Sequence, residues 1–568
     1  MSVTLTAAPP RRRARAGAMP HAALIGAHLG VAWAIFALAL CLGLFQMLHR
    51  SGLLAGFAND RLYYASVTAH GVGMAYLFTT FFAMGLGYFV LGTDRGTADE
   101  PGAGGGTKLF GEAVAWPAFA ATLFGGLLTS SPIVTGDASV LYTFYPPLRA
   151  HPAFYAGLLL VLAGSWTWAV LMIASAVRRR REIKAQHGPA LLPLPMFAVA
   201  IMGVVWLWAS AGMAVELVIQ LLPSGTARSV ADAGLARTLY SWTLHAIVYF
   251  WLTPAYLAFY ALFPRACGGR LFSDEAARIA FVLILLFSLP VGFHHLYADP
   301  EHGSAIKLLH AVLTFVVIAP TLLTIFTVTA SAEVGARLRG GRGTLGWVRA
   351  LPWGEPMALA GVLALVLLGL GGMSGIVNAS YGVNAMIHNT AWVPAHFHLI
   401  LGGATVILYF GTSYAILPAI TGRRLATRRL ATWQVAGWAF GIAAMTLPWH
   451  VLGLLGQPRR WARYDLDTAQ SLAWQPWMTA TSIGGVLAFA AGILFVAILV
   501  RSLRAEPLPP DLVFQWAAPL KRPNPHPLMD SILLWNGVIA VLMALAYGPA
   551  LVQAFAEAPA LVVPGWTP

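Results

Sequence analysis

Apolar segments long enough to cross a lipid bilayer follow one another along nearly the whole chain. A transmembrane helix needs about 20 mostly apolar residues, and segments of that kind occur at 21–48, 63–92, 111–134, 152–177, 193–222, 238–263, 276–297, 305–332, 353–376, 394–418, 431–456, 477–502 and 529–556. The composition agrees, because 58% of the 568 residues are hydrophobic and 10% are charged, unlike a soluble globular protein. The sequence therefore predicts an all-α fold, a polytopic bundle of about 13 transmembrane helices.

Positive charges are concentrated in a few segments between these spans, and they predict the topology. The clusters lie at 11–15, 178–184, 337–342 and 422–430. All four fall on the inner side if the N-terminus is cytoplasmic and the C-terminus outside, as the positive-inside rule requires. The net charge of +14 is thus explained without a nucleic-acid partner. The two cysteines, Cys41 and Cys267, are too few for a disulfide framework.

This topology predicts a simple domain organisation. We expect a basic cytoplasmic tail at 1–20, a single transmembrane domain at 21–556 and an outer tail at 557–568. The first apolar span is too long for a signal-peptide core and is followed by more of its kind, so it is expected to remain as a helix.

Six histidines lie within the apolar segments or at their ends: His70, His245, His294, His295, His396 and His398. At about 1.5 Å per residue along a helix, the topology puts all six in one layer in the outer half of the membrane. Any one of them alone is as well explained by a hydrogen-bonded contact between helices. Six at a common depth favour metal binding, because neutral imidazole is a common ligand for iron and copper.

The spacing of the histidines divides them among different sites. His396 and His398 are two residues apart, about 200° around a helix, so they suit two large planar cofactors on opposite faces of one helix. His294 and His295 are adjacent and can share one ion with a third ligand, for which His245 is available. With His70 as the second ligand of one haem, the pattern predicts two haems and one further metal ion.

Three runs of sequence resemble one family. They are LARTLYSWTLHAIVYFWLTPAYLAFY, SLPVGFHHLYADP and HNTAWVPAHFHL. In these runs, and over nearly its whole length, the chain resembles subunit I of the haem–copper oxidases, and within them the B-family cytochrome c oxidases of the ba type. The resemblance implies a cytochrome c oxidase subunit I-like fold in the plasma membrane of a bacterium or archaeon.

The resemblance also implies roles for individual residues. His70 and His398 correspond to the axial ligands of a low-spin haem b, and His396 to the single ligand of a high-spin haem, expected to be a-type. His245, His294 and His295 correspond to the ligands of the copper ion CuB. Tyr249 matches the tyrosine that, in this family, is cross-linked to a copper histidine and supplies an electron and a proton when the O–O bond breaks. Tyr249 and His245 are therefore the expected catalytic pair.

The chain departs from the family pattern close to these residues. Leu244 and Ala246 flank His245 where Gly and Pro are usual, from which we expect a straighter helix and no loss of copper. Ala395 stands before His396 where Gly is usual. Asn384 replaces a carboxylate often found near the high-spin haem propionates, which leaves His388 as the better candidate for proton loading there.

Arg459 and Arg460, in GQPRRW, lie on the outer side, where the topology rule disfavours cations. A solvated loop is one explanation. Pairing with haem propionates is the one we favour, because the guanidinium fork matches a carboxylate and the family uses its Arg pair in this way.

Hydroxyl groups at helical spacing indicate a route for protons from the inside to Tyr249. Tyr256 and Tyr260 continue its stripe on the sixth predicted helix, and hydroxyls on the eighth repeat every three residues. With Ser273, the set matches the family's K-type proton channel: Tyr256, Tyr260, Ser273, Thr321, Thr324 and Thr327. A single Thr in a membrane helix more often bonds to its own backbone, but the alignment of the set favours a channel. Ile247 stands where A-family oxidases carry the glutamate of a second channel, so one channel is expected, and Glu216 receives no role from the resemblance.

No electron-entry site is visible in the chain, because it has neither a Cys-rich copper motif nor a CxxCH haem motif. The resemblance implies a subunit II that carries the copper centre CuA, cytochrome c as donor, and a small single-helix subunit. The expected function is that of a terminal respiratory oxidase that reduces dioxygen to water and pumps protons.

Other functions remain possible on the sequence alone. A quinol-fed oxidase is one alternative, because the sequence does not fix whether cytochrome c or quinol is the donor. A nitric oxide reductase, which shares the six histidines but carries iron in the copper place, is the second. The second is disfavoured by Tyr249 and by the lack of a glutamate near His245. A transporter or haem-handling protein without redox turnover has no need of the His396 and His398 pair, and an inactive structural subunit has no need of intact ligands.

Overall fold

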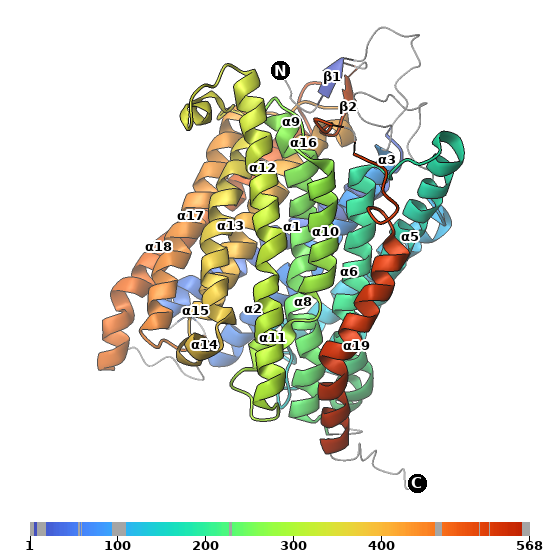
Figure 1. Cartoon of the computed structure of the whole chain (residues 1–568). Coiled ribbons are helices and arrows are strands. Elements are labelled where there is room, and N and C mark those ends of the chain that lie inside the picture. Colours follow the sequence, from blue (N-terminus) through green and yellow to red (C-terminus); the bar gives the residue numbers. More distant parts are fainter. Residues whose placement is uncertain are drawn as a thin grey trace.

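The structure is a computed structural model, and it describes residues 5–7, 19–54, 57, 59–93, 109–226, 230–460, 468–509, 512–521 and 523–558. Within these residues, twelve helices or continuous helix runs are long and apolar enough to cross a membrane, and they pack as one bundle (Figure 1). The predicted all-α fold of a multi-pass membrane protein is confirmed. The basic cluster at 11–15 and the tail beyond residue 558 lie outside the described residues.

The helices of the first half are α1 (Ala22–Arg50), α2 (Asp60–Val72), α3 (Thr79–Gly92), α4 (Ala115–Val134), α5 (Pro152–His187), α6 (Leu194–Glu216), α7 (Leu222–Gly225), α8 (Ala233–Ala261) and α9 (Phe263–Ala266). Those of the second half are α10 (Asp274–Ser288), α11 (Ser304–Val316), α12 (Ile318–Leu338), α13 (Pro356–Ala379), α14 (Tyr381–Ile387), α15 (Trp392–Phe397), α16 (Val406–Thr421), α17 (Arg428–Leu454), α18 (Ala469–Ser502) and α19 (Ile532–Glu557).

Short irregular turns join several of these helices. Three are π-helical, η1 (Gly73–Phe78), η3 (Leu217–Leu221) and η6 (His398–Thr405), and three are 3-10 turns, η2 (Glu112–Val114), η4 (Gly292–Leu296) and η5 (Gly346–Ala350). The π turns lie inside three membrane spans, Asp60–Gly92, Leu194–Gly225 and Trp392–Thr421. Because π turns inside helices occur often at functional sites, these three spans are candidates to carry one.

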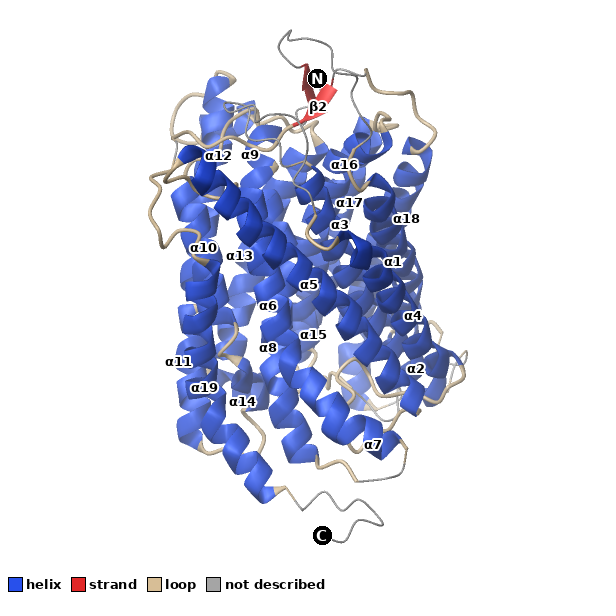
Figure 2. Cartoon of the chain, turned by 90° about the vertical axis from the view of Figure 1, so that its right-hand side faces the viewer, coloured by secondary structure: helices blue, strands red, loops and turns tan. Residues whose placement is uncertain are grey.

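Two short strands close one end of the bundle. Strand β1 (Leu5–Ala7) pairs antiparallel with β2 (Leu512–Phe514), with Leu5 opposite Phe514. Figure 2 shows these strands at the end opposite to the last turn of α19. The bundle therefore begins and finishes at opposite ends, which is consistent with the twelve candidate spans plus the shorter helix α10.

The seventh predicted span, 276–297, is not one continuous helix. Helix α10 has 15 residues and ends at Ser288, so it is too short to be among the twelve candidate spans. Pro290 comes two residues later, after the C-cap Leu289, and proline cannot continue the hydrogen-bond ladder of a helix. The chain then forms the 3-10 turn η4, which carries His294 and His295. The expectation that these histidines close a helix is corrected: they lie on a tight turn.

Small residues allow the helices to approach closely. A side chain at Gly125 or Gly157 would meet backbone atoms of the facing helix, at the contact between α4 and α5. Gly441 and Gly484 make the same kind of contact between α17 and α18. In lipid, apolar surface alone does not drive helices together, so close van der Waals packing of this kind supplies much of their association.

The most buried spans are at the centre of the bundle and carry four of the six histidines. They are Asp60–Gly92, Ala233–Ala261 and Trp392–Thr421, which contain His70, His245, and the pair His396 and His398. Every side chain of α3 is buried. The peripheral helices α1, α4, α18 and α19 instead expose apolar side chains, as expected for surfaces that face lipid.

Candidate functional site

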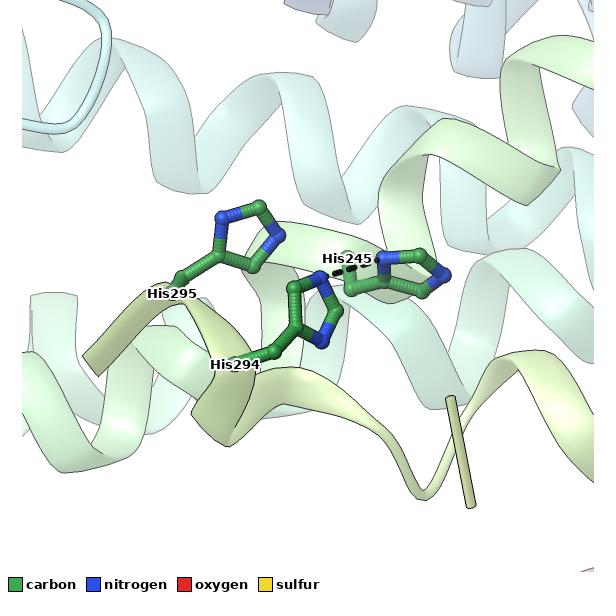
Figure 3. A group of neighbouring side chains, drawn as sticks. All are labelled: His245, His294 and His295. Carbon is green, nitrogen blue, oxygen red and sulfur yellow. Dashed lines mark hydrogen bonds between the residues drawn. The ribbon is translucent and has the colours of Figure 1, made fainter. Parts of the chain in front are cut away.

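Three histidines from two separate elements meet in the interior. His245 comes from α8, and His294 and His295 from the turn η4 (Figure 3). One ring nitrogen of each lies within 4.8 Å of the others, and Nδ1 of His245 is 3.1 Å from Nε2 of His294. Two nitrogens that each bind one ion at about 2.0 Å are at most about 4 Å apart. The pair at 3.1 Å meets this limit, and a side-chain shift of less than about 1 Å would bring the widest pair within it. The three imidazoles are thus placed to share a single metal ion of the kind that imidazole prefers, copper among them.

Helix α8 runs without a break through Leu244 and Ala246, as expected from the absence of Gly and Pro there. Tyr249 follows one turn after His245, and the two ring centres are 5.0 Å apart. The structure thus brings the tyrosine to the edge of the three-histidine cluster.

A cavity of about 300 Å³, here called the first cavity, lies between α1, α2 and the run from α15 to α16. His70 and His398 face each other across it, with ring centres 6.2 Å apart and ring planes 20° apart. Two metal–nitrogen bonds of about 2.0–2.1 Å, added to the distance from each ring centre to its nitrogen, come close to that separation. The pair therefore suits an iron ion at the centre of a planar group held from both sides.

A second cavity, of about 350 Å³, lies on the other side of the same helix run. His396 lines it, together with Tyr249 and all three histidines of the cluster. The two histidines His396 and His398 thus serve different cavities, as their angular separation around the helix predicts. A planar group bound by His396 would occupy the same cavity as the three-histidine cluster.

Hydrogen bonds fix the orientation of four of these imidazoles. The Nδ1–H groups of His70 and His398 donate to the carbonyl oxygens of Ala39 and Pro394, each at 2.7 Å. With Nδ1 protonated, Nε2 of each ring has a free lone pair and can bind a metal, and such outer partners also hold the ring in place.

Hydroxyl groups do the same for the other two. Ser374 donates its own hydrogen to Gly371 and accepts from Nδ1–H of His396 at 2.8 Å. Thr314 donates to the His310 carbonyl and accepts from Nδ1–H of His294 at 3.1 Å. Sequence reasoning missed Ala39, Ser374 and Thr314. Ala39 acts through its backbone carbonyl, and nothing in the sequence around a serine or threonine in an apolar helix indicates which imidazole it will contact after packing.

Arg459 and Arg460 line both cavities. Burial, followed by the charge of Arg460, lowers the pKa of Arg459 to about 10, so its guanidinium remains charged at neutral pH. A buried cation that has other cations as neighbours attracts anionic groups. The two guanidiniums thus suit the carboxylates of planar groups in the two cavities.

His388 and Asn384 also line the second cavity. Nδ1–H of His388 donates to Asn384 at 2.8 Å, and the amide of Asn384 donates to the carbonyl of Asn378 at 2.7 Å. Burial, with a smaller contribution from Arg459, lowers the pKa of His388 to about 4. His388 is therefore neutral at physiological pH, and Asn384 acts as its fixed hydrogen-bond partner.

The predicted hydroxyl track lies between α8 and α12. Tyr260 donates to Thr324 at 2.6 Å, and one helical turn nearer to the cluster Tyr256 is hydrogen-bonded to Thr321. Tyr256 and Thr321 line the second cavity together with Tyr249. The two helices thus carry two successive hydroxyl pairs, Tyr256–Thr321 and Tyr260–Thr324, the second farther from the cluster than the first.

The remaining two members of the track are placed differently. Thr327 is fully buried, and its hydroxyl has no partner among the described residues. Ser273 caps α10 by accepting from the backbone amide of Ala276 at 3.1 Å, so a local structural role accounts for it.

Comparisons with known proteins agree with this geometry. Residues 23–487 match the model of the family described as cytochrome c and quinol oxidase polypeptide I. The chain is 38% identical to cytochrome c oxidase subunit 1 of Thermus thermophilus over 89% of this chain and 88% of that one. It is 26% identical to cytochrome c oxidase subunit 1 of Thermostichus vulcanus, over 72% and 71% of the two chains.

A solved structure has the same fold. The chain superimposes on a subunit of a haem–copper terminal oxidase dimer with a TM-score of 0.85 and 32% identity, over 94% of this chain and 93% of that one. The family match, the long relative and the site geometry lead to one conclusion: the chain belongs to the cytochrome c and quinol oxidase polypeptide I family, the catalytic subunits I of the haem–copper oxidases.

Proposed function

We propose that the protein is the catalytic subunit of a terminal respiratory oxidase, which reduces dioxygen to water with electrons from cytochrome c and pumps protons. The observation that carries the proposal is the second cavity, where three clustered histidines and Tyr249 share one space with His396. The name of the relative from Thermus thermophilus, cytochrome c oxidase subunit 1, supports the choice of donor.

The residues that would hold the cofactors follow from the donor sets. His70 and His398 would bind a low-spin haem b in the first cavity, and His396 a high-spin haem, a-type in our proposal, in the second. His245, His294 and His295 would bind copper. When bound, these groups supply the electrons that dioxygen takes up.

The protein's own groups position these ligands and deliver protons. The carbonyls of Ala39 and Pro394 and the hydroxyl of Ser374 keep the iron-binding Nε2 atoms unprotonated and aimed at the cavities. Reduction of dioxygen consumes a proton for every electron. Tyr249 lies where it can give up its hydroxyl hydrogen, and the hydrogen-bonded pairs Tyr256–Thr321 and Tyr260–Thr324 supply a route for replacement protons.

Groups on the other side of the second cavity are suited to the pumped proton. Arg459 and Arg460 would pair with haem propionates, and His388, neutral and held by Asn384, can accept a proton when the charge nearby changes. His388 is therefore our candidate for transient proton loading.

The membrane orientation of the subunit is proposed from the distribution of positive charge, and its partner subunits are proposed from the family resemblance. The N-terminus would be cytoplasmic and the C-terminus outside, in a bacterial or archaeal plasma membrane. Because the chain itself has no electron-entry motif, a subunit II with CuA would receive electrons from cytochrome c, and a small single-helix subunit would complete the complex.

The test is chemical analysis of the purified complex. We expect two haem irons and one copper per subunit I, a low-spin haem b spectrum, and a second haem that binds carbon monoxide, with its type given by pyridine haemochrome analysis. Oxidation of reduced cytochrome c should consume oxygen. Three irons without copper, with the third iron in place of copper at the three histidines, would instead indicate a nitric oxide reductase. Activity with quinol alone would indicate a quinol-fed oxidase.

A further inference from the structure

Glu216 is a carboxylic acid inside the membrane domain that none of the steps above uses. It is the last residue of α6, has no solvent exposure, and is followed directly by the π turn η3. Its span, Leu194–Gly225, is among the twelve candidate membrane spans. An ionisable residue at such a position, next to a break in helical register, is expensive to maintain and usually has a function.

The immediate surroundings of Glu216 do not neutralise a carboxylate. Neither carboxyl oxygen has a hydrogen-bond partner among the described residues, and no described cation forms an ion pair with it. Moving an unpaired carboxylate out of water costs many kcal/mol, so such a group keeps its proton. Glu216 is therefore a neutral acid that carries a transferable proton.

Several of the described tyrosines lie near this acid, although none is hydrogen-bonded to it. Tyr76, Tyr145 and Tyr155 are all within electrostatic range of Glu216. Tyr76 is hydrogen-bonded to the hydroxyl of Tyr240. Both hydroxyl oxygens also lie within hydrogen-bond distance of the backbone oxygen of Tyr142, at 3.0 and 3.1 Å. Because each hydroxyl has a single hydrogen, one of them donates to this oxygen while the other donates to its partner hydroxyl. Buried hydroxyls that share partners in this way form a continuous network.

This network reaches the second cavity. Tyr142, Thr143 and Tyr145 line that cavity together with His245 and Arg237, and the Arg237 guanidinium lies 5.9 Å from the centre of the Tyr145 ring. The hydroxyls of Thr143 and Tyr145 have no partner among the described residues. They are therefore free to exchange hydrogen bonds between the cavity and the groups around Glu216.

On its other side, Glu216 is followed one turn later by Gln220, which leads away from the cavity. The Oε1 atom of Gln220 accepts from the backbone amide of Asp232 at 2.9 Å, and Asp232 caps the first turn of α8. The Nε2 atom of Gln220 is buried without a described partner. Gln220 thus lies between Glu216 and Asp232, at the end of the bundle where α8 begins.

From this arrangement we propose that Glu216 is a proton-holding group on the exit side of the second cavity. It releases its proton past Gln220 toward Asp232, and the carboxylate left behind is then reprotonated from the cavity through the hydroxyls of Tyr145, Tyr76 and Tyr240. In each transfer one O–H bond of the carboxyl breaks and re-forms, and no electron moves. The inference rests on the proposed oxidase function, because the reduction and oxidation of bound cofactors drive the transfer.

The experiment is redox-difference infrared spectroscopy on the intact, cofactor-loaded complex. We expect a difference band in the C=O stretching region of protonated carboxyls, with a frequency shift in D₂O. The band should be absent in Glu216→Gln, which keeps shape and neutrality but cannot give up the proton. It should shift in Tyr76→Phe. Glu182→Gln, at an exposed ion pair with Arg178 on α5, is the matched control and should leave the band unchanged.

Proton release from vesicles in response to oxygen pulses is the second measurement. Glu216→Gln should lose release to the outside while it still consumes oxygen in the presence of a protonophore. A band that persists unchanged in Glu216→Gln, or no carboxyl band in the wild type, would overturn the proposal. If wild-type vesicles consume oxygen without releasing protons, the pumping function fails, and the infrared band still decides whether Glu216 exchanges a proton.

Discussion

The hydroxyl oxygen of Tyr547 accepts a hydrogen bond of 2.7 Å from the backbone amide of Gly292. This contact joins the last helix, α19, to the first residue of the turn that carries His294 and His295. Next to it, the ring of Phe293 packs against the Tyr547 ring with centres 5.4 Å apart. The final helix of the chain therefore holds two of the three proposed copper ligands in place.

Tyr547→Phe removes the acceptor and leaves the Gly292 amide buried without a partner, which costs about 1–3 kcal/mol. We expect the turn to loosen and copper content to fall, as measured by elemental analysis of the purified complex. The optical spectrum of the haem between His70 and His398 should not change, because that site lies in the first cavity. Tyr381→Phe, at a partly exposed ring, is the control, and equal copper loss in both variants would contradict this role.

The same turn has no room for a side chain at Gly292. An added Cβ would collide with the backbone oxygen of Ser241 and the hydroxyl of Tyr547. Because a backbone oxygen in a packed helix cannot move aside, Gly292→Ala should abolish copper binding or prevent assembly. Gly548→Ala is the matched control: its Cβ would enter open space one residue after Tyr547. A Gly292→Ala variant with full copper content would show that the turn adjusts without cost.

Thr314 supports His294 from a neighbouring helix, and its hydroxyl can be removed almost without change of shape. Thr314→Val eliminates the acceptor for Nδ1–H of His294. Loss of such an outer partner typically lowers metal affinity by about 10–100-fold. The measurement is copper retention during titration with a chelator. Thr314→Ser, which restores the hydroxyl, should recover most of the affinity, and failure to recover it would point to packing as the cause.

Much of this site could be predicted from sequence, because its main features are local. The separation of His396 and His398 into two cavities follows from helix geometry over two residues. Tyr249 lies next to His245 because the two are one turn apart. By contrast, the turn at His294 and His295 was expected to be helical, because the apolar run around it hides the effect of Pro290.

The groups that hold the metal-binding histidines in place could not be predicted from the sequence. Ser374, Thr314 and Tyr547 are each brought to their partners by packing between separate helices, and the contact of Tyr547 with Gly292 joins segments that are 255 residues apart. A hydroxyl in an apolar helix can equally well donate its hydrogen bond to a backbone carbonyl of its own helix, and many of the hydroxyls in this bundle do so. Only the packed bundle distinguishes those that also contact a histidine or the turn that carries one.

The C-terminal segment before α19 is anchored by a buried carboxylate, and this gives a prediction on stability. Asp530 accepts from Arg180 at 2.6 Å and from the backbone amide of Leu192 at 3.0 Å. Asp530→Ala should destabilise the fold by about 2 kcal/mol, less than the about 3–5 kcal/mol of a fully buried pair, because Arg180 retains contact with water. Thermal loss of the haem absorption band measures this. Glu182→Ala, at an exposed pair, should cost about 1 kcal/mol or less.

The hydroxyl pairs between α8 and α12 predict which substitutions will slow proton delivery most. Thr324→Val removes the only described acceptor for the Tyr260 hydroxyl while it preserves side-chain shape. We expect oxygen consumption to fall by about 10²-fold, the lower end of what a positioned proton-transfer group contributes, with haem and copper content unchanged. Thr329→Val, on the same helix and away from the residues that line the second cavity, is the control. If Thr324→Val retains full activity with a normal solvent isotope effect, protons reach Tyr249 by a route that does not include Tyr260.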